Sequence, residues 1–462
     1  MSARAGALLA MLALGGCAAA PPLHRASRED HVTAPANRVG PAVELPTPPV
    51  LERAAAPAPT IARALSLPNG ARAAVITRRD ARLVAVAVEL AVPPATSWGT
   101  RWAFAASLLG GRNETHQHAL DRWLIANGVS VHHGVTRDGV VLELAVPAEH
   151  LGRALSLVGA EIAEFDVDEG DLDQTRGSLS LVLPRESDAD VLAVARRLAE
   201  GAISPGAAPG APEVVAREVS AVTRRDLLAL ARAVAVGGRV RVAVDGPMSL
   251  EAGELALRNA FGAYPAANTP TVAPPRFRGG SALVSDESAA EAAVLVAVRV
   301  PTPNGAGAAR LCAQAWKDAL YQNLRVRRGE SYVTDVRVVP FGAHADLRAW
   351  TTAKAGTGTR TLAAVMAELA RVSATRCGDR EQGWADLVRR RSAAAEVDFF
   401  ANAREALDDL RGGEAPQKTA PSPADVEAVA TSLDRSNAIA TVVDAGGERA
   451  AAAELDGWQL LH

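Results

Sequence analysis

The stretch VAVAVELAV, residues 84–92, ends at Pro93, and a similar stretch, AAVLVAVRV, occupies residues 292–300 and ends at Pro301. The two stretches begin 208 residues apart. Both are continuous, apolar and rich in valine, which predicts strands that are buried in a core. A buried strand repeated at this distance predicts that the chain holds two copies of one domain-sized unit.

The segments that follow the two strands support the repeat. A helical stretch comes next in each copy, then a second strand at residues 140–146 or 347–353, and then an amphipathic helix. The apolar positions of that helix fall on one helical face. They are Leu151, Leu155, Val158, Ile162 and Phe165 in the first copy and Leu362, Val365, Met366, Leu369 and Val372 in the second. We therefore predict an α+β fold of two homologous domains, each a mostly antiparallel sheet with helices on one face. Two unrelated α+β domains are the alternative.

Proline-rich segments indicate where the domains begin and end. Residues 18–60 carry nine prolines and no sustained apolar period, which is typical of an extended tether. A second proline-rich break covers residues 265–281. We therefore expect an N-terminal domain at 61–264 and a C-terminal domain at 282–462.

Residues 1–17 have the pattern of a bacterial lipoprotein signal peptide. A single basic residue, Arg4, precedes an apolar run and then small residues. The end of this segment, Leu14-Gly-Gly-Cys17, resembles a lipobox, in which the Cys17 thiol is joined to diacylglycerol. The residue after it is Ala18 and not aspartate, which by resemblance to the usual sorting rule favours the outer membrane if the cell is Gram-negative. We therefore expect a lipid-anchored protein of the cell envelope that faces the periplasm, with an ordinary secretory peptide as the alternative.

The net charge bears on the kind of partner, and the cysteines bear on a possible disulfide. The net charge of −3 gives no electrostatic reason to expect a nucleic-acid partner, because phosphate binding needs clustered positive charge. Two further cysteines, Cys312 and Cys377, could pair in an oxidising compartment. The sequence leaves open whether they lie close together.

Several segments resemble the pitrilysin/insulinase family of zinc peptidases, which includes the mitochondrial processing peptidase. Residues 67–76, LPNGARAAVI, are similar to the opening hairpin of that family. Residues 120–131, LDRWLIANGVSV, and 240–246, VRVAVDG, are similar to a later helix with its strand and to a valine-rich strand. The resemblance covers nearly all of residues 61–445 and implies the metallopeptidase-homologue fold.

The zinc-binding pattern of that family is missing. Active members carry H-x-x-E-H on the helix that follows the first glycine, here Gly99. Counted from that glycine, the first histidine, the glutamate and the second histidine fall on Trp102, Ala105 and Ala106, none of which can bind a metal or accept a proton. The third family ligand, a glutamate, would fall within residues 174–184, which contain no carboxylate. We therefore expect this chain to bind no metal.

The second copy keeps a different family feature. Residues 324–334, LRVRRGESYVT, resemble a segment in which an arginine and a tyrosine reach across to the zinc domain and bind the substrate. These roles map onto Arg325 and Tyr332, and Gly329 would allow the turn between them. A guanidinium can grip a peptide carbonyl, and a phenol can donate to an oxyanion. The alternative is an exposed helix residue and a tyrosine at the rim of a strand.

The resemblance thus implies a chain with substrate-binding residues but without zinc ligands. We expect it to be the non-catalytic subunit of a heterodimeric zinc metallopeptidase that acts on peptides or unfolded polypeptides. Zinc is then expected on the partner subunit, and the isolated chain is not expected to be an enzyme. The alternative is a non-enzymatic scaffold or peptide-binding lipoprotein of the envelope.

Overall fold

The fold is described from a computed structural model. The chain divides into the units Met1–Ala55 and Ala56–His462, and every described residue lies in the second unit. The structure describes residues 61–79, 81–110, 122–124, 126–183, 191–203, 210–268, 277, 279–285, 291–331, 333–412, 420–444 and 458–461. The signal peptide with Cys17 and the tether at 18–60 lie outside them, so these assignments stay predictions.

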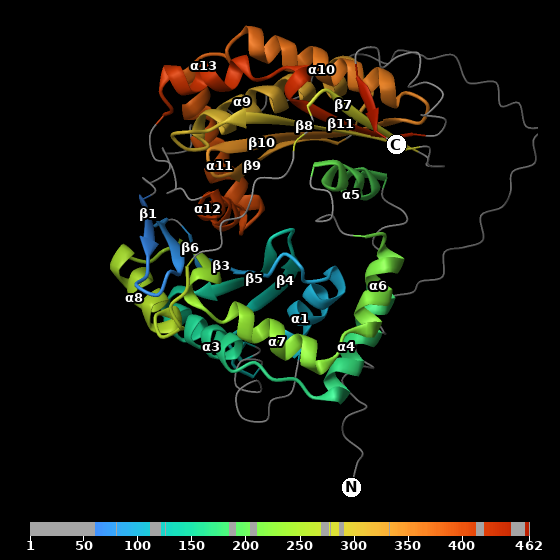
Figure 1. Ribbon diagram of the computed structural model, residues 1–462. Coiled ribbons are helices and arrows are strands. Elements are labelled where there is room, and N and C mark those ends of the chain that lie inside the picture. The colour runs from blue at the N-terminus through green and yellow to red at the C-terminus, as the bar shows by residue number, and fades with distance from the viewer. Residues whose placement is uncertain are drawn as a thin grey trace, which may run out of the picture. The chain divides into compact units, whose positions relative to one another are not determined.

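The first sheet has six strands in the order β1-β2-β6-β3-β5-β4 (Figure 1). Its strands are β1 (Ile61–Ser66), β2 (Arg72–Thr77), β3 (Leu83–Ala91), β4 (Ser130–Val135), β5 (Gly139–Pro147) and β6 (Val240–Gly246). All neighbouring strands are antiparallel except β2 and β6. The hairpin from β1 to β2 turns at Gly70, whose φ of 91° lies in the region that favours glycine.

The second sheet also has six strands, in the order β12-β7-β11-β8-β10-β9. Its strands are β7 (Ser281–Ser285), β8 (Glu291–Pro301), β9 (Thr334–Phe341), β10 (His344–Lys354), β11 (Ala438–Val443) and β12 (Gln459–Leu461). Strand β7 is parallel to β11 and to β12, and the other neighbours are antiparallel.

Five strands of each sheet correspond in order, which confirms the repeat and the α+β fold class. Strands β2-β6-β3-β5-β4 match β7-β11-β8-β10-β9, and the two stretches that revealed the repeat are β3 and β8. Only the sixth strand differs, because β1 comes from a local hairpin and β12 from the C-terminus. Contacts group residues 56–462 as one unit, so the domain boundaries stay a prediction.

One face of the first sheet is covered by helices from the same copy (Figure 1). The helices on this side are α1 (Trp98–Gly110), α3 (Leu151–Ala163) and α8 (Leu250–Phe261), which contact the sheet, and α4 (Glu169–Val182), α6 (Pro212–Ala221) and α7 (Arg224–Val234), which pack against α1. The predicted amphipathic helix is α3, and its Leu155 and Ile162 are fully buried. Thr223 and Asp226 form a capping box that starts α7.

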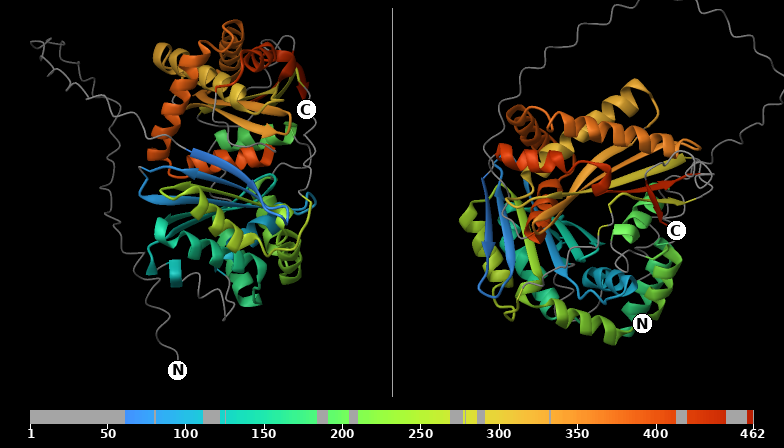
Figure 2. Two further views of the ribbon diagram at one scale, coloured as in Figure 1. Left: turned by 90° about the vertical axis from the view of Figure 1, so that its left-hand side faces the viewer. Right: turned by 45° about the horizontal axis from the view of Figure 1, so that its top comes forward.

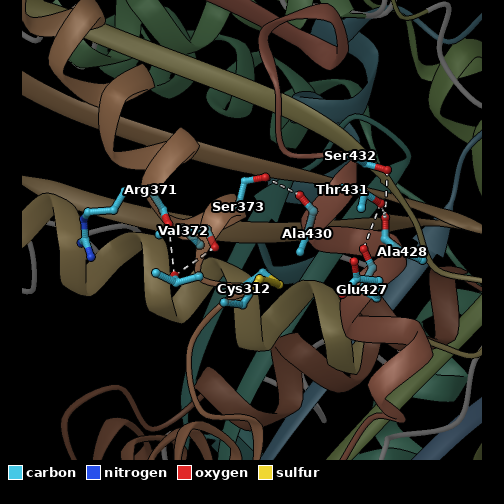
Figure 3. Close-up of a disulfide and its surroundings, with 11 residues drawn as sticks. Cys312, Arg371, Val372, Ser373, Glu427, Ala428, Ala430, Thr431 and Ser432 are labelled. Carbon is cyan, nitrogen blue, oxygen red and sulfur yellow. Dashed lines mark hydrogen bonds between the residues drawn. A yellow bond between two sulfur atoms is a disulfide. The ribbon is translucent and has the colours of Figure 1, made fainter.

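The equivalent face of the second sheet carries a second set of helices. They are α9 (Gly307–Leu320), a π-helical turn η3 (Tyr321–Arg327), α10 (Gly358–Ala374) and α13 (Pro423–Thr431), and α11 (Arg380–Val397) packs against α9. A disulfide between Cys312 of α9 and Cys377 joins α9 to the turn after α10 (Figure 3). This bond answers the question that the sequence left open.

The other face of each sheet is covered by a helix from the opposite copy (Figures 1 and 2). Helix α12 (Ala401–Gly412) packs on the first sheet, and helix α5 (Val191–Ile203) packs on the second. The prediction of helices on one face only was wrong in this respect. The reason is visible in β3, whose side chains from Val84 to Ala91 are buried on both faces.

None of the helices in the described part combines the length and the apolar character that a membrane span requires.

Candidate functional site

Helix α1 carries the three positions that correspond to zinc ligands and base in the resemblance. Ala105 is fully buried, and Trp102 and Ala106 pack against the same core. The Gly99 N–H donates to the carboxylate of Glu218 on α6 at 2.8 Å, which fixes the start of α1. An indole and two methyl groups offer zinc no lone pair. These residues do not fit a zinc ion, and they act as core packing.

A buried arginine next to these positions has a structural role. The Arg101 guanidinium donates to the main-chain carbonyls of Thr96, Thr136 and Arg137, and so ties α1 to the turn between β4 and β5. Burial lowers the pKa of Arg101 from its usual value. The carbonyl oxygens satisfy the charge, so this side of α1 is part of the scaffold.

The predicted place of the third zinc ligand is on helix α4. Its last turn exposes Leu181 and Val182, and it offers no carboxylate between Gln174 and Val182. Over the described residues, no three His, Cys, Asp or Glu side chains are grouped so that they could hold a metal ion. The three positions on α1 and residues 174–182 of α4 therefore offer none of the imidazole, thiolate or carboxylate ligands that zinc prefers.

Arg325 lies on the exposed side of the π-helical turn η3. Its Cζ atom is 5.6 Å from the centre of the Tyr321 ring, which is within cation–π distance. Gly329 follows with a φ of 63°, and its N–H donates to the Arg325 carbonyl at 3.2 Å. Tyr332 lies outside the described residues, so its pairing with Arg325 stays a prediction.

The side chains of η3 point in three directions. Leu324 points into the core and is fully buried. Asn323 and Arg327 line a pocket of about 560 Å³ beside α10, and the Asn323 amide donates to Glu368 at 2.6 Å. Tyr321 and Val326 are exposed, by 42% and 57%. These two residues could not be predicted from the sequence, because no local sequence signal predicts a π-helical turn.

Buried carboxylates attach helix α12 to the first sheet. Glu89, fully buried on β3, accepts from Arg411 of α12 at 3.0 Å and from Arg241 of β6 at 3.2 Å. Burial works against the charge of Glu89, but Arg411 and Arg241 outweigh it and lower the pKa of this carboxyl. Glu143 of β5 accepts two hydrogen bonds from Arg404, at 2.5 and 2.7 Å.

Helix α5 is attached to the second sheet mainly by apolar contacts. Leu192 and Ile203 of α5 pack against Leu295 and Ile439 of the sheet. One ion pair, between Glu200 and Arg348, accompanies them. Helix α12 therefore covers this face of the first sheet, and helix α5 covers the equivalent face of the second.

The comparisons with known proteins agree with this geometry. No protein-family profile and no curated protein sequence matches the chain. Among solved structures, a peptidase M16 inactive domain from Pseudomonas fluorescens is 15% identical, has a TM-score of 0.62, and is matched over 83% of this chain and 98% of its own. The first half of the periplasmic protease PqqL from Escherichia coli is 15% identical, with a TM-score of 0.56 and coverage of 87% and 96%. Pitrilysin is 15% identical, with a TM-score of 0.57 and coverage of 84% and 45%.

These neighbours identify the class of fold. The chain has the peptidase M16 fold that pitrilysin-like proteases share with an inactive domain, which confirms at the level of the fold the resemblance seen in the sequence. The chain spans about half the length of pitrilysin and nearly all of the first half of PqqL.

Proposed function

We propose that this chain is the non-catalytic, substrate-binding subunit of a heterodimeric zinc metallopeptidase of the insulinase type, held in the cell envelope by a lipid on Cys17. The observation that carries the proposal is helix α1. In a fold shared with proteases, Trp102, Ala105 and Ala106 stand where the family has two zinc-binding histidines and the glutamate that activates water. Catalysis in such a protein needs metal from another chain.

The length of the matched structures supports a partner. Pitrilysin contains about twice the length that this chain matches, and PqqL is described by halves. This chain has the fold of one half of pitrilysin and lacks the zinc-binding residues on α1. Such a chain suits an assembly in which a second subunit, similar to the other half, binds the zinc. Arg325 is exposed and can reach a polypeptide held between two such halves.

The disulfide supports the envelope location. Cys312 and Cys377 are bonded and nearly fully buried, and such bonds persist in oxidising compartments such as the periplasm. The lipobox at residues 14–17 points to the same place. The periplasmic protease PqqL shows that this fold occurs there.

The test of the partner role is a reconstitution. The chain is purified alone and together with an encoded neighbour that carries H-x-x-E-H, and cleavage of a quenched fluorescent peptide is measured. We expect activity only when both chains are present, and a loss of about tenfold or more in kcat/KM for Arg325→Ala, because a charge-assisted hydrogen bond to substrate is lost. Full activity of the zinc-bearing chain by itself would favour the scaffold alternative.

The test of the anchor is a separate experiment. We expect mass spectrometry of the membrane fraction to find Cys17 as a lipid-modified N-terminus. Cys17→Ser should release the chain from the membrane fraction, because the acyl chains supply the attachment. An unmodified Cys17 would contradict the anchor and leave the partner role untouched.

A further inference from the structure

A polar side chain of η3 is tied to helix α10. The Asn323 side-chain N–H donates to the Glu368 carboxylate at 2.6 Å. Glu368 lies within α10, its side chain is 12% exposed, and its second oxygen accepts from the Arg371 Nε at 2.8 Å. A carboxylate so far from water costs free energy unless hydrogen bonds satisfy it. One of the two hydrogen bonds that do so comes from η3.

Helix α10 is a firm support for this hydrogen bond. Leu369, the residue after Glu368, is fully buried in the core of the second copy. The disulfide between Cys312 and Cys377 joins α9, which leads directly into η3, to the turn after α10 (Figure 3). The core and the disulfide therefore hold the position of Glu368 relative to α9.

Asn323 also spans the π-helical turn itself. Its Oδ1 accepts from the Arg328 Nε at 3.1 Å, and its main-chain carbonyl accepts from the Arg328 N–H at 3.1 Å. The two residues are five positions apart, which is the spacing of π-helical hydrogen bonds. In an α-helix five residues make about 1.4 turns, so these two side chains would point in different directions. The side-chain hydrogen bond therefore favours the wider turn over an α-helix.

The width of this turn sets the direction of Arg325, which lies two residues after Asn323. A π-helical turn holds about one residue more than an α-helical turn. Re-winding of η3 as an α-helix would therefore rotate Arg325 by up to roughly 100°, the angle of one residue. π-Helical turns are rare and are frequent at functional sites. A side chain that favours the π-helical turn thus also favours one direction of Arg325.

We propose that Asn323 and Glu368 are positioning residues, which hold the π-helical turn and thereby fix the direction of the Arg325 side chain. This inference rests on the proposed substrate-binding role of Arg325 and adds two residues on which that role depends. Neither residue has to touch the substrate. The guanidinium fork hydrogen-bonds its acceptors in a fixed geometry, and a misplacement of about 1 Å in such a group can lower a rate about a hundredfold.

The first measurement follows amide hydrogen exchange in the full mature chain on its own. Asn323→Ala removes both side-chain hydrogen bonds, so exchange of the amides at 323–330 should become about tenfold faster. Glu368→Ala breaks the bond from the side of α10 and should act in the same direction. Glu368→Gln keeps an acceptor for Asn323, and Gln322→Ala removes an exposed amide from the same turn, so both should stay within about twofold. Unchanged exchange in Asn323→Ala would overturn the inference.

The second measurement is cleavage of the quenched peptide by the reconstituted pair of chains. We expect Asn323→Ala to lower kcat/KM about tenfold, as Arg325→Ala does. When the two changes are combined, kcat/KM should fall no more than about twofold below that of Arg325→Ala, because a displaced arginine has already lost its contact. An asparagine that stabilised only the fold would act independently of Arg325. Losses that multiply in the double variant would therefore overturn the positioning role.

Arg325→Ala by itself separates this inference from the proposed function. Full activity of this variant would contradict the substrate-binding role of Arg325. The exchange measurement needs neither partner nor substrate. Faster exchange in Asn323→Ala would then still support the hold of Asn323 on the turn, and unchanged exchange would overturn it.

Discussion

Helices α12 and α5 occupy equivalent places on the two sheets, but they are attached by different forces. Three carboxylates of the first sheet, Glu89, Glu143 and Asp245, receive hydrogen bonds from α12. On the second sheet the contact is mainly apolar, with the Glu200–Arg348 ion pair and the Arg196 guanidinium over the Trp350 ring beside it. Buried charges require one orientation of the helix, whereas apolar contacts tolerate small shifts. Substitution of a single residue should therefore lower the free energy of unfolding more at the contact of α12 with the first sheet than at the contact of α5 with the second.

The largest effect is expected from Glu89→Ala. This change leaves the buried guanidinium of Arg241 and the partly buried one of Arg411 without their shared carboxylate. We expect a loss of about 3–5 kcal/mol in the free energy of unfolding, measured by chemical denaturation. Glu254→Ala on α8 removes a more exposed carboxylate and is the control, with an expected loss of less than about 1 kcal/mol. Equal losses of unfolding free energy in the two variants would contradict the claim that the buried ion pairs of Glu89 stabilise the fold more than the exposed pair of Glu254.

An intermediate effect is expected from Ile203→Ala. Ile203 is almost fully buried where α5 meets the second sheet. Removal of its apolar atoms should cost about 2–4 kcal/mol, depending on how far the helix can settle into the space. Hydrogen exchange should become faster in β8 and β11, which lie under α5. No change in either strand would show that α5 contributes little to this sheet.

A smaller effect is expected from Glu200→Gln. The Glu200 side chain is 25% exposed, and the paired Arg348 also contacts Asp346, which receives two hydrogen bonds from Arg299. Because the glutamine keeps a hydrogen-bond acceptor near Arg348, the free energy of unfolding should fall by about 1 kcal/mol. A loss as large as that of Glu89→Ala would mean that the two helices are attached alike.

The pH dependence of stability should differ in sign for two carboxyls near Arg411. The pKa of Glu89 is lowered in the fold, so its contribution is present above its unfolded pKa and is lost as the pH falls through the folded value. Burial raises the pKa of Asp408 to about 6, so stability is lost as the pH rises from about 4 to about 6. Asp408→Asn should therefore stabilise the protein at pH 7 but not at pH 4, and thermal unfolding across this range tests it. A gain that is independent of pH would contradict this assignment.

The sequence was enough to predict the repeated sheets, because long valine-rich runs and helical periodicity are local signals. It was not enough to predict where α5 and α12 pack, because an amphipathic pattern shows that a face is buried but not on which sheet. One signal was present and could have been used. Apart from Glu89, strand β3 is apolar on both faces and carries small residues such as Ala85 and Ala87 towards α12, which indicates cover from two sides.

In the candidate site, too, some features can be predicted from the sequence and others depend on the fold. The apolar positions on α1 can be read directly from the sequence, since their side chains rule out metal binding wherever the helix lies. The arrangement of Tyr321, Arg325 and Val326 cannot, because it depends on a π-helical turn in a segment that reads as an ordinary helix. The disulfide between Cys312 and Cys377 also needed the fold, since the two residues are 65 positions apart.

The most direct test of the central claim is metal analysis of the purified proteins. We expect no zinc in the isolated chain after dialysis, and one zinc for each pair of chains when the H-x-x-E-H partner is present, bound to that partner. Zinc bound in equal amount to the isolated chain, together with chelator-sensitive cleavage of peptides by it, would contradict the account.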